Sequence, residues 1–391
     1  MSFEQYKNDD KQYIANTYAR FDVMIVKGQN ATCYDESGNE YIDMTSGIGV
    51  NSLGFCDKKW VEAVSCQSGQ LQHISNLYYT KPQIELAKKL CNKTGFSRVF
   101  FANSGAEANE GAIKAARKYS FDKYKTDRYE IITLKNSFHG RTITTLSATG
   151  QDVFHNFFFP FTEGFVYGEP NIIESTKELL SEKTCAIMIE VIQGEGGVLP
   201  LDKQFVADVE ALCRENDLVL IVDEVQTGIG RTGKLLATEN YGISPDIVTL
   251  AKGLGGGLPI GAILFNKKLE STLGASHHAT TFGGNPVAAA GAGAIIDRVS
   301  APEFLADVSK KGSYIRKKAE EIDGVLATRG LGLMIGIELC GKKAADVAKT
   351  CVANGLLVLT AKDVIRLLPP LTITYDEINK AMAILTKVIE Q

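Results

Sequence analysis

The sequence predicts an α/β protein with a large domain, in which helices cover a mainly parallel sheet, and a smaller α+β domain. The chain has 391 residues, more than a single core usually organises, which indicates more than one domain. Amphipathic helical patterns alternate with short apolar segments rich in β-branched residues, which are typical of strands buried on both faces of a parallel sheet. The predicted strands are 98–102, 129–134, 185–191, 218–224, 246–251 and 261–265.

Turn and capping patterns predict the elements before and after this sheet. Residues 31–44, ATCYDESGNEYIDM, alternate around a Ser-Gly-Asn turn and predict a β-hairpin. Helical patterns cover 106–121 and 204–218, between predicted strands. Beyond about residue 300 we expect a helix, a strand, a second helix, two short strands and a last helix. That last helix begins with the capping-box spacing Thr374 to Glu377.

The order of these elements predicts the domain organisation. Residues 56–299 are expected to form the large domain, and residues 300–391 the C-terminal small domain. Residues 1–55 are expected to be an N-terminal segment whose hairpin packs with the small domain.

Composition excludes several classes of protein. The net charge is -4 and no run of Lys and Arg supplies the footprint of a nucleic-acid binder. Eight scattered cysteines, without a CxxC pair or a His at zinc spacing, predict reduced thiols, no metal site and a cytoplasmic protein. The polar N-terminus and the lack of an apolar run of about 20 residues argue against export and against a membrane-spanning helix.

Candidate functional residues follow the predicted strands, because a parallel α/β sheet carries its site at the carboxyl ends of the strands. Lys252 directly follows the segment 246–251. A desolvated lysine has a lowered pKa and becomes a nucleophile or a Schiff-base former, although a lone lysine more often reaches solvent or binds phosphate. Asp223 ends the segment 218–224, where a buried carboxylate needs a protonated ring nitrogen, a metal, an arginine or a structural ion pair.

Two further stretches could bind phosphate. At Ser104-Gly105-Ala106 a strand turns into a helix, whose free N–H groups suit an anion, but Ser104 and Glu107 also fit a plain N-terminal cap. The stretch GIGRTG, 228–233, spells GxGxxG and would favour a nicotinamide-dependent oxidoreductase. In such folds the glycines follow the strand directly, whereas here two acidic residues intervene and would repel a pyrophosphate.

A lysine, an acid and a phosphate cradle at the ends of strands in one sheet match three parts of pyridoxal phosphate. Nearly the whole chain resembles the class III pyridoxal-phosphate-dependent aminotransferases, which have fold type I. The resemblance rests on the segments FFANSGAEANEGAIKAARK, FHGRT, QGEGGV, VDEVQTGIGRTG, AKGLGGGLPIGA, TTFGGNPVAAAGA and VIRLLPPLTI.

The resemblance implies roles for the cofactor-binding residues. Lys252 would hold pyridoxal phosphate covalently and shuttle a proton, and Asp223 would keep its ring nitrogen protonated. Val225 and Phe138 would pack on the two faces of the ring, and Gln226 would bond the ring hydroxyl. Ser104, Gly105 and Ala106 would bind the phosphate. Thr281 of the partner subunit would complete the phosphate site, which implies an obligate homodimer.

The resemblance also implies two substrate carboxylate sites. Arg141 would bind the carboxylate far from the cofactor, and Arg366 would bind the α-carboxylate of glutamate. Glu195 would pair with Arg366 when an ω-amine occupies the site. Glu190 would be a supporting residue near the ring, and His139 is interpreted as a structural neighbour of Phe138.

The implied reaction moves the δ-amino group of N-acetyl-L-ornithine to 2-oxoglutarate, giving N-acetyl-L-glutamate 5-semialdehyde and L-glutamate, in arginine biosynthesis. Other ω-amino donors, namely ornithine, succinyldiaminopimelate and 4-aminobutyrate, remain alternatives, as does a binding relative without catalysis. The chain departs from the family pattern at 55–59, FCDKK, a segment that is not expected to touch the cofactor.

Overall fold

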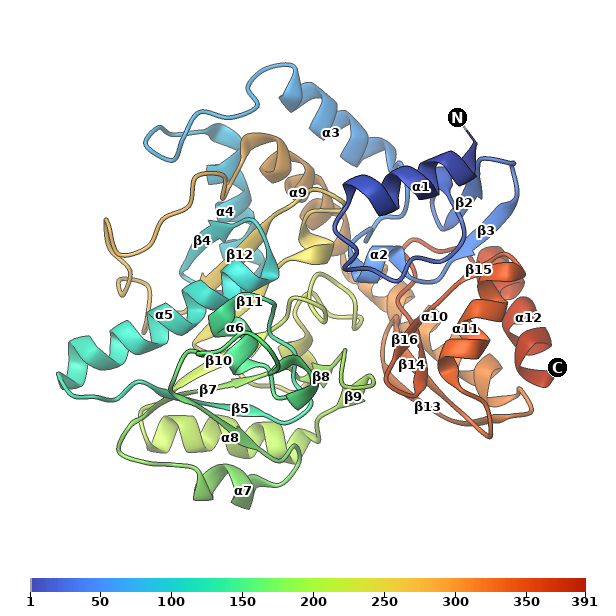
Figure 1. Ribbon diagram of the computed structural model, residues 1–391. Coiled ribbons are helices and arrows are strands. Elements are labelled where there is room, and N and C mark those ends of the chain that lie inside the picture. The colour runs from blue at the N-terminus through green and yellow to red at the C-terminus, as the bar shows by residue number, and fades with distance from the viewer. Residues whose placement is uncertain (1) are drawn as a thin grey trace.

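The computed structural model describes residues 2–391, and its largest feature is a seven-stranded sheet (Figure 1). The strand order is β4-β12-β11-β10-β7-β5-β6. All strands are parallel except β12, which runs antiparallel to both β4 and β11. The strands are β4 (Arg98–Ala102), β5 (Glu130–Leu134), β6 (Phe165–Gly168), β7 (Thr184–Ile189), β10 (Val219–Asp223), β11 (Ile247–Leu250) and β12 (Gly261–Phe265).

This sheet confirms the predicted fold class and strands, with boundaries that differ by at most two residues. Strands β7, β10, β11 and β12 are buried along their whole length, which explains their continuous apolar sequences. The edge strand β6 was not predicted, because only four residues pair there and they are half-buried for the most part.

Helices cover both faces of the sheet and form the layers seen in Figure 1. Helix α5 begins directly after β4 and packs against β11 and β12, while α8 packs against β7 and β10. Helices α3, α4 and α9 pack together beside β4. The bounds are α3 (Lys58–Ser68), α4 (Lys81–Thr94), α5 (Gly105–Tyr124), α6 (Ile143–Ala148), α7 (Ile173–Glu178), α8 (Lys203–Glu215) and α9 (Pro286–Val299).

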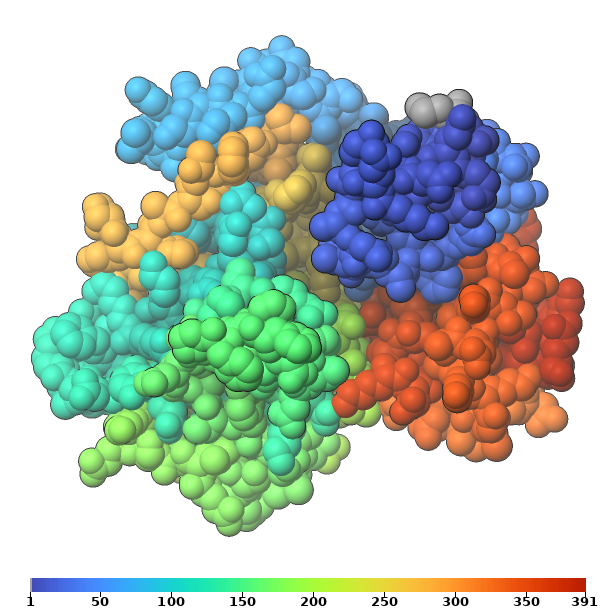
Figure 2. Space-filling model, viewed as in Figure 1, coloured from blue at the N-terminus to red at the C-terminus, as the bar shows by residue number. Residues whose placement is uncertain are grey.

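The N-terminal segment forms a sheet that includes a strand from near the C-terminus. The predicted hairpin is present as β2 (Thr32–Asp35) and β3 (Glu40–Asp43), with β1 (Ile25–Gln29) on one side. On the other side β3 pairs in parallel with β15 (Leu356–Leu357). In Figures 1 and 2 the N-terminal residues accordingly lie against the C-terminal part of the chain.

The C-terminal part has a second four-stranded sheet, in the order β13-β14-β17-β16. Three short strands, rather than the predicted two, precede the last helix, because β15 joins the N-terminal sheet. The last helix has the predicted capping box between Thr374 and Glu377. The boundaries at residues 55 and 299 stay a prediction. The bounds are α10 (Pro302–Glu320), β13 (Val325–Leu331), β14 (Met334–Leu339), α11 (Ala344–Ala353), β16 (Leu359–Ala361), β17 (Val364–Leu367) and α12 (Tyr375–Glu390).

Four shorter or peripheral elements complete the description. They are α1 (Phe3–Tyr13), α2 (Ser46–Gly49), β8 (Ile192–Gln193) and β9 (Leu199–Pro200). In residues 2–391 no helix combines the length and the apolar character needed to cross a bilayer. All eight cysteines are unpaired.

The GIGRTG segment connects the large sheet to the C-terminal part. Arg231 is 2% exposed, and its guanidinium donates hydrogen bonds to the carbonyl of Leu333 (3.0 Å), the carbonyl of Pro369 and Oγ of Ser46 (3.3 Å). Burial lowers the pKa of Arg231 to about 9, although Asp43 opposes this shift. This arginine is therefore committed to internal contacts, which argues against the nicotinamide alternative.

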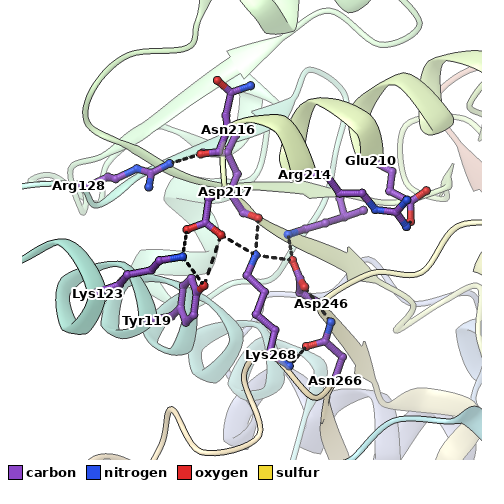
Figure 3. A network of polar contacts seen from close by, with 12 residues as sticks. Tyr119, Lys123, Arg128, Glu210, Arg214, Asn216, Asp217, Asp246, Asn266 and Lys268 are labelled. Carbon is purple, nitrogen blue, oxygen red and sulfur yellow. Dashed lines mark hydrogen bonds and ion pairs between the residues drawn. The ribbon is translucent and has the colours of Figure 1, made fainter.

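A network of charged side chains binds together the edge of the sheet opposite the carboxyl ends (Figure 3). Asp217 precedes β10, Asp246 precedes β11, and Lys268 follows the antiparallel β12. Lys268 Nζ lies 3.5 Å from Asp217 and 3.4 Å from Asp246, while Lys123 from the end of α5 pairs with Asp217 at 2.8 Å. The carboxyl ends of the strands are thus left for the functional site.

Candidate active site

A cavity of about 410 Å³ lies where the parallel strands end. Lys252 and Asp223 both line it, together with most of the predicted site residues. Three predicted residues are not part of this lining, namely Glu195, Arg366 and Thr281. The predicted residues in the lining are Ser104, Gly105, Ala106, Phe138, Arg141, Glu190, Asp223, Val225, Gln226 and Lys252.

Lys252 is the first residue of a short 3-10 turn that follows β11. Its backbone is left-handed, with φ at 43°, a conformation that costs about 1–3 kcal/mol for a side chain of this kind. Burial lowers the pKa of Lys252, and the nearby Arg366 acts in the same direction against three carboxylates. The amine therefore loses its proton at lower pH than that of an exposed lysine.

Asp223, at the end of β10, accepts hydrogen bonds from neutral groups. Its Oδ1 accepts from the Val225 N–H (2.9 Å), and its Oδ2 accepts from Asn109 Nδ2 (2.7 Å). His139 Nδ1 lies 2.9 Å from the same Oδ2. The interpretation of His139 as a mere neighbour of Phe138 therefore missed its principal contact, and Asn109 was missed altogether. One face of the carboxylate remains toward the cavity.

A second carboxyl group, Glu190, stands beside Asp223. Burial raises the pKa of Glu190 well above its usual value, and the charge of Asp223 raises it further. Its Oε2 accepts a hydrogen bond from the Phe138 N–H at 2.9 Å. Glu190 therefore tends to keep its proton to higher pH than an exposed glutamate does.

The start of α5 forms another part of the cavity wall. The Ser104 side chain accepts a hydrogen bond from the Glu107 N–H (3.1 Å), so the plain N-terminal cap is present. A Cβ on Gly105 would lie 2.7 Å from Val225 Cγ1, so only glycine allows the helix to begin this close to Val225. The first N–H groups and the positive end of a long helix suit an anionic group here.

Arg366, in β17, forms an ion pair with Glu195 at the side of the cavity. Its Nη1 lies 2.6 Å from Glu195 Oε1 and 3.3 Å from Gln226 Oε1. Burial raises the pKa of Glu195, but Arg366 outweighs this effect and holds the pKa below its usual value. The ion pair is therefore present at neutral pH and is lost only as the pH falls through that lowered pKa. Arg366 Nε is buried without a partner in the described chain, which leaves a donor for a further acceptor.

Arg141 lies at the mouth of the cavity and is exposed to solvent. Its guanidinium is 5.4 Å from the centre of the Phe138 ring and 4.0 Å from that of Phe154. These rings hold the arginine without neutralising it, so that it can bind an anion. No pattern in the sequence singles out Phe154 for this contact.

Thr281 is exposed and belongs to a surface formed by two loops. Asn76 Nδ2 donates hydrogen bonds to the carbonyls of Thr280 (3.2 Å) and Gly283 (2.9 Å), which joins these loops side by side (Figure 2). Leu77 is 88% exposed on this surface. The other large apolar side chains exposed on these loops are Ile74, Tyr78, Tyr79 and Phe282.

Comparison with known proteins gives one family over almost the whole chain. The family described as Aminotransferase class-III matches residues 13–389. The chain is 51% identical to the acetylornithine aminotransferase of Haemophilus ducreyi, with all of both chains covered. It is 45% identical to the acetylornithine aminotransferase of Methanocaldococcus jannaschii, covering 100% of this chain and 99% of the relative.

Solved structures with this fold include two kinds of aminotransferase. The ornithine aminotransferase of Toxoplasma gondii superposes with a TM-score of 0.95 at 31% identity, covering 100% of this chain and 95% of that one. The N-acetylornithine aminotransferase of Stenotrophomonas maltophilia superposes with a TM-score of 0.84 at 36% identity, covering 97% of each chain.

Proposed function

Because the chain belongs to the class III aminotransferases, we propose that it transfers the δ-amino group of N-acetyl-L-ornithine to 2-oxoglutarate. The products are N-acetyl-L-glutamate 5-semialdehyde and L-glutamate, and the reaction serves arginine biosynthesis. The observation that carries this function is the full-length similarity to acetylornithine aminotransferases together with a cavity that holds Lys252 and Asp223.

The residues of the cavity fit pyridoxal phosphate. The start of α5 offers N–H groups to a phosphate through Ser104, Gly105 and Ala106, and Asp223 offers a carboxylate that neutral donors alone engage. Lys252 offers an amine with a lowered pKa. In this proposal Phe138 and Val225 flank the ring, and Gln226 bonds its hydroxyl.

When bound, pyridoxal phosphate supplies an aldehyde that reacts with amines and a ring that accepts an electron pair. Asp223 would hold a proton at the ring nitrogen, because an ionised carboxylate favours that cation. Lys252 would anchor the cofactor and would supply the base that removes the proton from the substrate carbon bearing the nitrogen. Glu190, whose pKa is raised by burial, would stand beside Asp223 near the ring.

Two arginines would select the substrates. Arg141, at the mouth, binds the carboxylate that lies far from the reacting nitrogen in both amino donors. Arg366 binds the α-carboxylate of glutamate, which then takes the place of Glu195. When N-acetylornithine is bound, no carboxylate lies there, and Glu195 neutralises Arg366 instead.

A homodimer is part of the proposal. The surface around Leu77 and Phe282 exposes five large apolar side chains on two adjacent loops, and clustered exposed apolar side chains are typical of an interaction surface. A second copy would cover it, and Thr281 on the same surface would then reach the phosphate site of the partner subunit.

Steady-state kinetics with several amines test the substrate assignment. The structural likeness to an ornithine aminotransferase makes ornithine the main competitor. We expect kcat/KM to be highest for N-acetylornithine when it is compared with ornithine, succinyldiaminopimelate and 4-aminobutyrate. A clear preference for free ornithine would contradict the substrate assignment. A purified protein without a visible pyridoxal absorption band would contradict the proposal that it binds pyridoxal phosphate.

Substitution Glu195→Gln is expected to change the balance between the two amino donors. Without the Glu195 charge, Arg366 stays unneutralised when N-acetylornithine is bound, so kcat/KM for this donor should fall about 10- to 100-fold. The value for glutamate should stay the same or rise, because its carboxylate no longer competes with Glu195. The ratio of the two values, measured in each half-reaction, reports the effect.

A matched control for this variant is Glu338→Gln, which breaks a similar pair with Arg329 (3.3 Å) outside the cavity. It should leave the ratio unchanged. An equal loss with both donors in Glu195→Gln would mean that Glu195 does not exchange with a substrate carboxylate.

Substitution Leu77→Asp is expected to convert the dimer to monomers that bind the cofactor weakly. A charge placed in an apolar interface loses its hydration without gaining a partner. Light scattering coupled to size-exclusion chromatography reports the mass, and absorption titration reports cofactor affinity. Leu326→Asp, at a residue that is 60% exposed in β13, is the control and should stay dimeric. A dimer of unchanged affinity in Leu77→Asp would place the interface elsewhere.

A further inference from the structure

Asn109 is a buried residue of α5 that contacts two strands, β10 and β11, and the loop that contains His139. It is 1% exposed, and its Nδ2 donates to Asp223 Oδ2 (2.7 Å) and to the carbonyl of His139 (2.7 Å). Its Oδ1 accepts a hydrogen bond from Thr249 Oγ1 at 2.7 Å. Every polar atom of this side chain therefore has a partner, in a place where an unpaired polar atom would be costly.

The chemistry of the partners fixes the orientation of the amide. An ionised carboxylate and a carbonyl oxygen only accept hydrogen bonds, so the nitrogen of Asn109 must face Asp223 and His139. The hydroxyl of Thr249 then donates to the oxygen. With the amide turned over, two oxygen-oxygen contacts would replace the two hydrogen bonds.

His139 completes the set of donors around Asp223 and is itself anchored. Its Nδ1 lies 2.9 Å from Asp223 Oδ2, while its Nε2 is buried without a partner in the described chain. This arrangement places a proton on Nδ1, which faces an acceptor, whereas a proton on Nε2 would find no acceptor in the described chain. Asn109 holds the backbone of this same residue through its carbonyl.

We propose that Asn109 is a positioning residue that fixes the Asp223 carboxylate relative to α5, the helix whose first residues border the cavity. The same helix would hold the phosphate, so Asn109 sets the spacing between the anion site at one end of the cofactor and the carboxylate at the other. This inference rests on the proposed function of the cavity.

Substitutions at Asn109 test this role. Asn109→Ala removes one of two side-chain donors to Asp223 Oδ2, while Thr249 Oγ1 stays 3.5 Å from Oδ1, and Asn109→Asp places a second carboxylate against Asp223. We expect kcat to fall about 10-fold in the first variant and further in the second, because hydrogen bonds to charged groups are strong. The KM for 2-oxoglutarate should change less than threefold, since Asn109 does not touch the arginines.

Two readouts separate positioning from a general loss of structure. Cofactor affinity, measured by absorption titration of the apo-protein, should weaken about 10-fold. The pH profile of kcat/KM should change as well, because the Asp223 charge that Asn109 positions acts on the pKa of both Glu190 and Lys252. The other titratable groups that face Asp223 are His139, Glu190 and Lys252, and none of them is changed.

A second variant keeps the test decisive if the first two fold poorly. Thr249→Val removes the hydroxyl that holds Asn109 Oδ1, so it should shift the same readouts in the same direction by a smaller factor. Ile113→Val, in the buried face of α5, is the control for a loosened helix and should lower the melting temperature without moving the pH profile.

The results distinguish this inference from the proposed function. If wild-type protein binds pyridoxal phosphate and turns over, but the Asn109 and Thr249 variants match Ile113→Val in affinity and pH profile, the positioning role is wrong. If wild-type protein itself shows no cofactor band, the proposed function fails first. Weaker cofactor binding with a changed pH profile in Asn109→Asp and Thr249→Val supports the role.

Discussion

Substitution Lys252→Ala is expected to lower turnover by at least about 10³-fold and to abolish covalent attachment of the cofactor. The variant loses both the amine that anchors the cofactor and the base that moves the proton of the substrate. Among residues 2–391 no other lysine lines the cavity, so no second lysine amine is placed to replace it. Stability should change little, since the left-handed backbone at this position costs alanine as much as it costs lysine.

Borohydride reduction followed by peptide mapping measures the attachment directly. The wild-type protein should carry the reduced cofactor on the peptide that contains Lys252, and the variant should carry none. Lys267→Ala, at a surface lysine paired with Glu270, is the control and should behave as wild type. Turnover retained in Lys252→Ala would refute the assignment of this lysine.

Substitution Asp223→Asn should be the next most damaging change, with a loss of about 10²- to 10³-fold in kcat. The asparagine is nearly isosteric but uncharged, so it no longer favours a proton on the ring nitrogen. Its NH2 group replaces one of the two carboxylate oxygens, so it faces either the Val225 N–H or the donors Asn109 and His139, which leaves unpaired N–H groups in a buried place. Both effects weaken cofactor binding as well as turnover.

Single-turnover absorption experiments with each amino donor separate the chemical step from binding. Asp246→Asn is a matched control, since Asp246 also accepts a hydrogen bond from a backbone N–H but precedes β11, in the network at the edge opposite the carboxyl ends (Figure 3). It should lower thermal stability without slowing the chemical step. A chemical step that is as fast in Asp223→Asn as in wild type would exclude Asp223 as the partner of the ring.

Much of the fold and the centre of the candidate site could be predicted because strand ends share an edge of the sheet. The apolar segments predicted the strands, and the residues that follow them, such as Ser104, Asp223 and Lys252, line one cavity. The direction of β12 could not be predicted, since an apolar segment has the same composition in either direction. The short strand β6 was missed because four half-buried residues carry little pattern.

Contacts between side chains of elements far apart in the chain could not be predicted from the sequence. In the sequence Asn109 resembles any polar residue of an amphipathic helix, although its side chain donates a hydrogen bond to Asp223, 114 positions later. His139 bonds to the same carboxylate across 84 positions. Arg366 and Glu195 stand 171 positions apart, and only a family resemblance suggested that they meet. Such pairs depend on rotamers and on helix placement, which spacing does not encode.

The reversal of β12 constrains how this protein can diverge. After Lys252 the chain turns back and enters β12 beside the strand that it has just left, and Gly257, Leu258, Pro259 and Ile260 on the way also form cavity wall. The reactive amine and this part of the cavity wall therefore belong to one short continuous segment of the chain. An insertion there would disturb both at once, so lineages that acquire new substrates should vary the loops that end other strands instead.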